Sequence, residues 1–93
     1  MKRVRFLKRA IQDLIEIDEH TRAHSPRGAA RVGARIRKRA DDLARFPESG
    51  TLSEKTGLRQ LYVAKAPYML IYRIRGNEVQ IITILHTSRN RRS

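Results

Sequence analysis

The chain has 93 residues, of which 21 are Lys or Arg and 9 are Asp or Glu, giving a formal net charge of +12. This length predicts one domain with a single modest core that buries about 60–65% of the extended chain's surface. Because there is no room for two lobes around a ligand, we expect no cofactor and no small-molecule substrate, and any site must lie on an open face or in a shallow groove. The absence of cysteine excludes disulfides and thiolate zinc sites.

The basic excess is present in both halves of the chain and is not confined to a tail. Such a field attracts polyanions, namely RNA, DNA, the ribosome or an acidic protein, and solubility alone is the alternative explanation. The N-terminal segment MKRVRFLKRA has no unbroken apolar run, because Arg5 and Lys8 interrupt it. No stretch approaches the ~20 apolar residues of a membrane span, so we expect a cytoplasmic protein without membrane contacts.

The N-terminal part of the chain predicts a short strand over residues 3–6 and then two helices. The first helix follows the spacing of Leu7, Ile11, Leu14 and Ile15 and is expected to end near Thr21. His20 and His24 lie four residues apart, a spacing that suits two metal ligands on a helix. No third ligand is evident and the helix end is expected to fray, so we predict no metal site.

Ser25 and Pro26 signal a second helix, with Ser25 as N-cap and Pro26 at the first helical position. Pro47 should end this helix. Its apolar residues recur with a period near 3.6: Ala29, Val32, Ile36, Ala40, Leu43 and Phe46. A basic stripe runs along another side, either as a solvated face or as a site for an anionic partner: Arg27, Arg31, Arg35, Lys38 and Arg45.

The C-terminal part predicts strands. A polar loop over residues 47–57 precedes the strand GLRQLYV, and Gly76-Asn77 is a two-residue hairpin turn. This turn places Arg75 opposite Glu78 and, further along, Ile71 opposite Ile82. One face should be apolar and covered by the helices: Tyr68, Leu70, Tyr72, Ile74, Val79, Ile81, Thr83 and Leu85. The other face should hold Arg73, Gln80 and His86, and is either a binding surface or partly buried under the 47–57 loop.

His86 is the strongest candidate for acid–base chemistry. A histidine beside arginines suits proton transfer at a phosphodiester, with arginines stabilising the developing charge. The alternative is a strand-end histidine that makes local hydrogen bonds. Arg89 and Arg91 follow as candidate phosphate contacts. No Gly-rich phosphate loop or nucleophile elbow is present, and no pair of carboxylates stands out.

The motif PYMLIYRIRGNEVQIITILHTSR, preceded by GLRQLYV, resembles the RelE/ParE superfamily of bacterial toxins, more closely ParE. Asp13-Leu14 and the segment LARFPESG also fit, so the resemblance covers nearly the whole chain. It implies one α+β domain over residues 1–93, ordered β-α-α-β-β-β, with a helical hairpin packed on one face of a small, mostly antiparallel sheet. Residues 89–93 are a candidate disordered basic tail.

The resemblance implies a toxin of a type II toxin–antitoxin pair, bound in a hetero-oligomer by a cognate antitoxin. Characterised ParE-like members poison DNA gyrase, whereas RelE-like members cut messenger RNA on the ribosome. RelE's two lysines and arginine carry over to Gln60, Tyr62 and Met69, so that catalytic set is missing. Some ribosome-dependent relatives use histidine, arginine and glutamate instead, for which His86, Arg59 and Arg73 are candidates.

Three hypotheses therefore stand. The leading one is a ParE-like toxin that binds an essential target, DNA gyrase. The second is a ribosome-dependent endoribonuclease that uses His86 with Arg59 or Arg73, and the third is an inactive relative that only binds antitoxin. The residues expected to contact the partner or target are Arg59, Arg73, Gln80, His86, Arg89 and Arg91.

Overall fold

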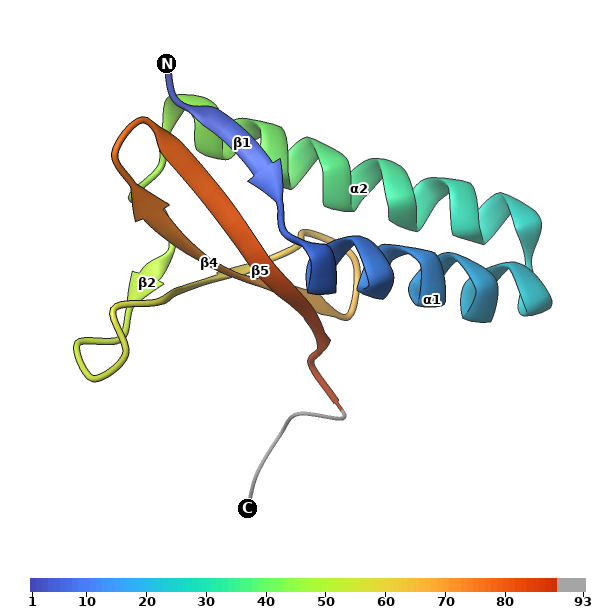
Figure 1. Cartoon of the computed structure of the whole chain (residues 1–93). Helices are drawn as coiled ribbons and strands as arrows, with labels where there is room; N and C mark the ends of the chain where they lie inside the picture. Colours follow the sequence, from blue (N-terminus) through green and yellow to red (C-terminus); the bar gives the residue numbers. More distant parts are fainter. Residues whose placement is uncertain (89–93) are drawn as a thin grey trace.

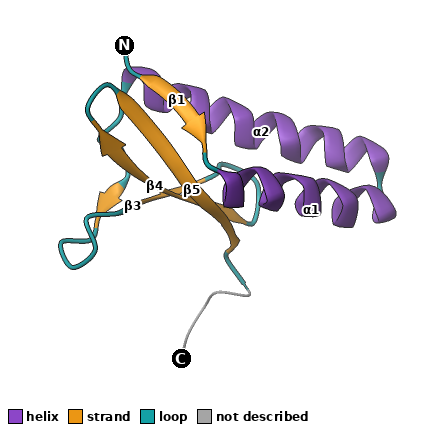
Figure 2. Cartoon of the chain, viewed as in Figure 1, coloured by secondary structure: helices purple, strands orange, loops and turns teal. Residues whose placement is uncertain are grey.

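In the computed structural model, which describes residues 1–88, two helices pack on one face of a five-stranded sheet (Figure 1). The elements in chain order are β1 (Arg3–Phe6), α1 (Lys8–His24), α2 (Pro26–Arg45), β2 (Thr51–Leu52), β3 (Arg59–Tyr62), β4 (Tyr68–Arg75) and β5 (Glu78–His86). The strand order is β1-β5-β4-β3-β2, and only β1 and β5 run parallel (Figure 2). The predicted α+β fold, with a helical hairpin on one face, is confirmed.

The N-terminal elements match the predicted strand and helices, with one wrong boundary. β1 has the predicted bounds, but α1 continues past Thr21 to His24. Nothing at Thr21 breaks a helix, and the chain leaves the helical conformation only at Ser25, the residue before a proline. The Ser25 Oγ then accepts a 3.0 Å hydrogen bond from the Gly28 amide, which confirms the predicted N-cap of α2.

The polar segment over residues 47–57 is not wholly a loop, because it contains β2. Thr51 pairs with Gln60 and Leu52 pairs with Arg59, which makes β2 one of the two edge strands of the sheet. The predicted set of strands was therefore one short. A strand of two residues is too short to show any alternation of apolar and polar side chains, so the sequence pattern did not reveal it.

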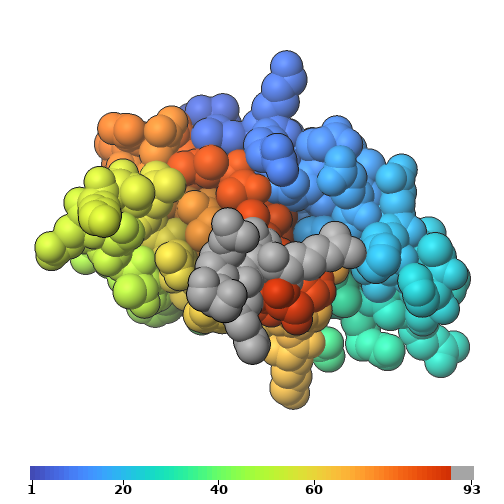
Figure 3. Space-filling view, turned by 90° about the horizontal axis from the view of Figure 1, so that it is seen from below, coloured from blue at the N-terminus to red at the C-terminus, as the bar shows by residue number. Residues whose placement is uncertain are grey.

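The core lies between the helices and the covered face of the sheet. The helices contribute Ala10, Ile36, Ala40 and Leu43. The strands and the residue after β3 contribute Leu61, Val63, Tyr68, Leu70, Tyr72, Val79, Ile81 and Ile84. Figure 3 views the molecule from below and shows the orange and red atoms of the hairpin between the blue atoms of β1 and α1 and the yellow atoms near residues 50–60. The hairpin is therefore the centre of the sheet, and its exposed face positions the candidate site.

The β4–β5 hairpin confirms the predicted register near the turn but not beyond it. Four residue pairs next to the turn are as predicted, beginning with Arg75 opposite Glu78 and ending with Tyr72 opposite Ile81. A bulge then leaves Ile82 as an extra residue, so that Ile71 opposes Thr83 and not Ile82. Because opposed residues share a face, the bulge exchanges the faces of every later residue of β5.

This exchange corrects the predicted faces. Ile84 pairs with Leu70 and is 5% exposed, so it takes the core position predicted for Thr83, and Leu85 pairs with Met69 on the open face. His86 pairs with Tyr68, a residue of the covered face. The prediction that His86 shares the open face with Arg73 and Gln80 was therefore wrong.

Candidate functional site

The three residues considered for nuclease chemistry do not lie together. Arg73 and Gln80 pair with one another on the open face of β4 and β5. His86 lies on the opposite, helix-covered side at the end of β5. Arg59 pairs with Tyr72, whose side chain is fully buried, so Arg59 also belongs to the covered side.

Arg59 holds the segment that follows α2. Its Nη1 donates to the backbone oxygens of Gly50 at 2.9 Å and Glu48 at 3.3 Å. The Tyr72 hydroxyl donates to Pro47 O and accepts from the Gly50 amide, each at 2.8 Å. Residues 47–50 therefore pack at the end of the covered face, and residues 51–52 extend the sheet as β2, so this part of the predicted loop does not bury the open face.

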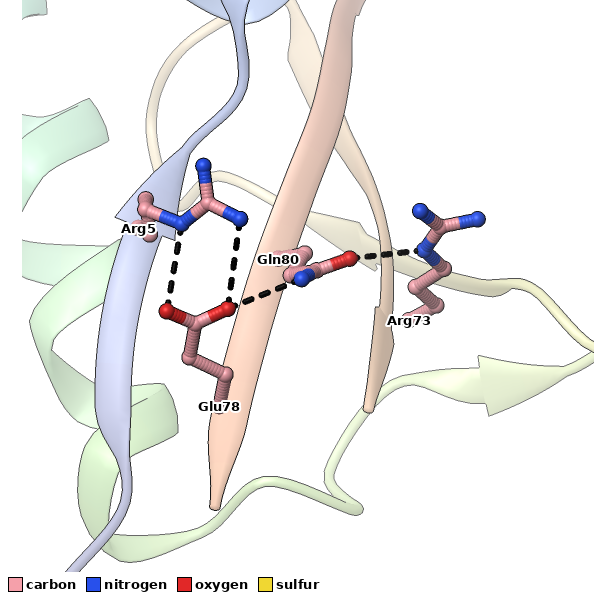
Figure 4. A network of polar contacts seen from close by, with 4 residues as sticks. All are labelled: Arg5, Arg73, Glu78 and Gln80. Atoms are coloured by element: carbon pink, nitrogen blue, oxygen red, sulfur yellow. Dashed lines mark hydrogen bonds and ion pairs between the residues drawn. The ribbon is translucent and has the colours of Figure 1, made fainter. Parts of the chain in front are cut away.

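The open face carries a chain of polar side chains across three strands (Figure 4). Arg73 donates from Nε to the Gln80 Oε1 at 2.8 Å, and the Gln80 Nε2 donates to the Glu78 Oε1 at 2.8 Å. Glu78 also accepts from Arg5 Nε and Nη2, at 3.1 and 3.3 Å. We call these four residues the polar ladder: Arg5, Glu78, Gln80 and Arg73.

The carboxylate of Glu78 stays charged within the polar ladder. The hydrogen bond from Gln80 lowers the pKa of Glu78 below its usual value, and Arg5 lowers it further. Arg3, which pairs with Glu78, and Arg75, at the end of β4, are both exposed beside the ladder. This part of the face therefore holds four arginines and one carboxylate, both of whose oxygens already accept hydrogen bonds.

The same face is apolar further from the hairpin turn. Ile71 pairs with Gln60, and Met69 pairs with both Tyr62 and Leu85. Tyr62 is 63% exposed, while Met69 and Ile71 are half-buried. The open face thus combines a cationic half with an apolar half.

His86 does not lie on the open face. It lines a pocket of about 350 Å³ between α1 and the end of β5. Its ring meets the Tyr68 ring edge-on, with 5.2 Å between the ring centroids, and its Nδ1 lies 3.2 Å from the Ser88 amide. The pocket is lined by Arg9, Asp13, Glu16, Ile17, His20, Tyr68, Ile84, Leu85 and His86. His86 therefore has titratable neighbours, but they come from α1 and not from the open face.

Asp13 is a structural residue whose role the sequence did not reveal. It is 7% exposed, and its Oδ2 accepts hydrogen bonds from the Thr83 hydroxyl and from the Ile84 amide, the latter at 2.9 Å. Arg9 Nε donates to the other oxygen at 3.1 Å. Asp13 thus serves as the hydrogen-bond acceptor for the backbone of β5 just after the bulge. Only a contact across some 70 positions identifies this role, and no local pattern carries such information.

Part of the basic stripe on α2 has structural partners. Arg35 Nη1 donates to Lys65 O, and Arg39 Nε donates to Tyr62 O, each at 3.0 Å. Lys38 forms an ion pair with Asp42. Arg35, a member of the stripe, and Arg39, which lies beside it, thus hold the β3–β4 connection against α2, whereas the Lys38 pair lies within the helix.

The remaining sequence predictions concern metals, membranes and the tail. The His20 and His24 rings lie 5.3 Å apart at the end of α1, and within residues 1–88 no three His, Cys, Asp or Glu side chains gather as a metal-binding group. Neither α1 nor α2 is long and apolar enough to cross a membrane. Arg89 and Arg91 lie outside the described residues.

Comparison with known families gives a match over nearly the whole chain. Residues 4–91 match the family described as the ParE toxin of type II toxin–antitoxin system, parDE. A protein of Sinorhizobium fredii named "Putative toxin Y4kP" is 40% identical, over 91% of this chain and 88% of its own length. Toxin RelE2 of Caulobacter vibrioides is 37% identical, over 96% of this chain and 99% of its own length.

Solved structures share the fold. A chain from the chromosomal ParDE toxin–antitoxin system of P. aeruginosa superposes with a TM-score of 0.81 and is 26% identical, covering 92% of this chain and 96% of that one. A chain of the RelBE2 toxin–antitoxin complex of Mycobacterium tuberculosis gives a TM-score of 0.67 at 27% identity, covering 91% and 96%. The similar proteins thus carry names from both branches of the superfamily.

Proposed function

Since this chain belongs to the ParE toxin family of type II toxin–antitoxin systems, we propose that it stops growth by binding DNA gyrase and that a cognate antitoxin neutralises it. Both partners would meet it in the bacterial cytoplasm. The family match over residues 4–91 and the whole-chain resemblance to ParE support this choice of target.

One observation favours binding over RNA cleavage, namely the separation of the candidate catalytic residues. Arg73 lies on the open face, His86 lies in the pocket beside α1, and Arg59 donates to backbone oxygens of the 47–50 segment. A nuclease needs its acid, base and charge-stabilising groups around a single phosphodiester. The arrangement of these three residues does not provide that.

An antitoxin partner agrees with the charge of the chain. The structures that it resembles come from toxin–antitoxin systems. A net charge of +12 favours a partner with acidic segments, and it brings such a partner to the surface quickly.

The decisive experiment is to express the chain without an antitoxin and to assay two activities of the purified protein. We expect inhibition of gyrase supercoiling and no site-specific cleavage of messages on translating ribosomes. His86→Ala should leave the supercoiling inhibition within about twofold of the parent. Message cleavage that is lost in His86→Ala, with supercoiling intact, would refute the gyrase proposal.

Ribosome-dependent RNA cleavage is the second candidate, because two of the similar proteins carry RelE names. The pocket that holds His86 also contains Arg9, Glu16 and His20, so the required residue types are present there. Under this alternative, Arg9→Ala and His86→Ala would each abolish cleavage, while Arg59→Ala and Arg73→Ala would not.

An inactive relative that only binds antitoxin would behave differently in both assays. Growth would continue despite soluble expression, supercoiling and messages would be unaffected, and the antitoxin would still bind. This outcome would reject the gyrase and ribosome targets together.

A further inference from the structure

The exposed side of α2 carries cations that have no structural partner. Arg27, Arg31 and Arg45 are exposed, and none of them forms a side-chain hydrogen bond or ion pair within residues 1–88. Together with Lys38 they recur at intervals of one or two helical turns, so they follow one line along the helix. Ile36, on the opposite side of α2, is fully buried. The basic stripe therefore faces away from the sheet and into solvent.

The β3–β4 connection places further cations beside the stripe. Arg35 donates to Lys65 O and Arg39 donates to the last residue of β3, each at 3.0 Å, and the Lys65 side chain is exposed. A shallow groove of about 360 Å³ lies between α2 and this connection, lined by Ala34, Arg35, Lys38, Arg39, Asp42 and Ala64. Asp42 already accepts a 2.7 Å hydrogen bond from a lysine of α2. An anion that enters the groove therefore meets an excess of cations.

The charge balance of α2 indicates a partner with many negative charges. The helix has seven cations and two carboxylates, a net charge of +5. One carboxylate, Asp42, is paired with Lys38. The other, Asp41, is exposed beside the stripe and reduces the positive charge at one position only. Charge of one sign concentrated on one side of a helix attracts polyanions and speeds their association.

The side chains between the cations indicate which polyanion fits. Ala30, Ala34 and Ala64 are exposed and small. Within residues 1–88, the large exposed apolar side chains beside the stripe are Met1 and Phe46, both at its C-terminal end. A protein partner gains affinity from large apolar and aromatic anchors, and single-stranded nucleic acid gains it from aromatic rings on which bases stack. A duplex needs neither, because it is held through its phosphates.

The length of the stripe also suits a duplex. Arg27 and Arg45 lie near the two ends of α2, and a straight helix rises about 27 Å between them. Duplex DNA carries one negative charge per about 1.7 Å of its axis, so phosphates are available along the whole stripe. Contacts to phosphates fix the position of a duplex and do not read its sequence.

We propose that the basic stripe, together with Lys65, binds the phosphate backbone of duplex DNA without preference for its sequence. The choice of DNA over duplex RNA rests on the proposed function, because gyrase acts on duplex DNA. The stripe lies on the far side of the helical layer from the sheet, since α2 packs on the covered face (Figure 1). Bound DNA would therefore leave the open face of the sheet accessible to another partner.

The test is binding of the full chain to fluorescently labelled duplexes of about 20 base pairs and two unrelated sequences. Anisotropy is measured between about 0.05 M and 0.2 M salt. We expect the two duplexes to bind within about threefold of each other. The triple variant Arg27→Gln, Arg31→Gln and Arg45→Gln should weaken binding by at least about tenfold at 0.1 M salt. The slope of log K against log salt should become shallower by about 2–3, because each lost phosphate contact removes about 0.9.

A second triple variant is the matched control, namely Arg3→Gln, Lys55→Gln and Arg75→Gln. These residues are exposed and lie outside α2, and their replacement removes the same charge. We expect less than about a threefold loss of affinity and an unchanged slope. Glutamine favours helix about as well as arginine, and circular dichroism checks that each variant folds. The single variants Arg31→Gln and Arg75→Gln repeat the comparison with one charge each.

Three outcomes would overturn the proposal. Equal weakening by the two triple variants would mean that net charge alone binds DNA. No binding of either duplex by the parent chain at about 0.05 M salt would remove the site. Tighter binding of single-stranded DNA or of duplex RNA than of duplex DNA would assign the stripe to a different nucleic acid.

A separate assay of gyrase supercoiling distinguishes this proposal from the proposed function. A chain that binds duplex DNA through the stripe without inhibiting supercoiling would refute gyrase as the target and leave the DNA surface standing. A chain that inhibits supercoiling but binds duplex DNA equally well without the stripe arginines would refute the DNA surface alone.

Discussion

Asp13 shows how a single carboxylate completes a sheet edge. β1 pairs with β5 only as far as Ile81, and the Leu7 amide then donates to Ile81 O. Beyond this point no strand within residues 1–88 pairs with this edge of β5, and the Ile84 amide is buried. Asp13 supplies the missing acceptor. Since a buried amide without a partner is costly, α1 is joined to the sheet by this polar contact as well as by apolar packing.

We therefore predict that Asp13→Ala lowers the free energy of unfolding by about 1–3 kcal/mol, because it leaves the Ile84 amide without an acceptor. Asp18→Ala is the control: Asp18 lies on the same helix but forms an exposed pair with Arg22. Because that pair is exposed to solvent, its loss should change the stability much less than the loss of Asp13. Urea unfolding of both variants gives the comparison, and equal losses would contradict the assigned role of Asp13.

Tyr72 predicts a dependence of stability on alkaline pH. Burial raises the pKa of Tyr72 above its usual value, although the Gly50 amide and Arg59 act in the opposite direction. A pKa that is raised in the folded state means that stability is complete below the usual tyrosine pKa, about 10. Stability is then lost as the pH rises through the higher folded value.

Thermal unfolding from neutral pH to above pH 10 tests this expectation, with Tyr62→Phe and Tyr72→Phe compared. Tyr62 is exposed, so Tyr62→Phe should keep the alkaline loss of the parent chain. Tyr72→Phe should be less stable at neutral pH, because the bonds to Pro47 and Gly50 are gone. Its further alkaline loss should be smaller, and an unchanged loss would exclude Tyr72 as its source.

At the scale of elements, the sequence predicts what local chemistry determines. Gly76-Asn77 defined the turn and the first pairs of the hairpin, and Ser25-Pro26 defined the start of α2, because turn and cap residues act on their neighbours. The predicted register was wrong from the bulge of β5 onward, where Asp13 of α1 accepts hydrogen bonds from the residues after Ile82. A contact between distant segments leaves no local pattern.

The residues of the candidate site also differ according to whether a local or a distant contact places them. Arg73 and Gln80 lie before the bulge, counted from the turn, and the structure places them together on the open face as expected. His86 lies beyond the bulge, so it is on the helix-covered side of the sheet and not on the open face as predicted. Arg59 was considered for chemistry, but its partners are backbone oxygens of a segment that the sequence predicts as loop.

The segment leading into β2 depends on a glycine. A Cβ at Gly50 would lie 2.6 Å from the Tyr72 hydroxyl and 2.8 Å from Gln60 O. We predict that Gly50→Ala costs about 1–3 kcal/mol of stability through overpacking and detaches β2 from β3. Hydrogen exchange of the Thr51 and Leu52 amides, together with urea unfolding, measures both effects.

Gly33→Ala is the matched control for that experiment. Gly33 lies inside α2, and the nearest atom to an added Cβ is the flexible end of Arg37, at 3.3 Å. Because alanine favours helix over glycine, this variant should be neutral or more stable by up to about 1 kcal/mol. Destabilisation by both variants to the same extent would show that the close packing at Gly50 is not the cause.

At the scale of the whole molecule, repulsion between cations should dominate the electrostatics. The chain has 21 Lys and Arg against 9 Asp and Glu, and the ion pairs of the described residues are largely exposed. Exposed pairs contribute little, whereas a high net charge opposes the compact state. Added salt should therefore stabilise the fold.

We predict that the free energy of unfolding rises as NaCl increases from about 0.01 M to about 0.15 M, over which the screening length falls from about 30 Å to about 8 Å. Binding to any anionic partner should weaken over the same range. Urea unfolding and titration at each salt concentration give both values. A fall in stability with salt would mean that the ion pairs outweigh the repulsion.

The parallel pairing of β1 with β5 has a consequence for synthesis of the protein. β5 inserts between β1 and β4, and residues 3–6 find their strand partners at residues 78–81. The helices also need β5, because Asp13 bonds to it and Val79 and Ile81 form part of their core. Such distant contacts make folding slow relative to a helical bundle. Until β5 has left the ribosome, the nascent chain lacks the strand that joins β1 to β4 and the part of the open face that β5 carries. A partner that recognises the complete open face therefore has nothing to bind before translation of β5 is complete.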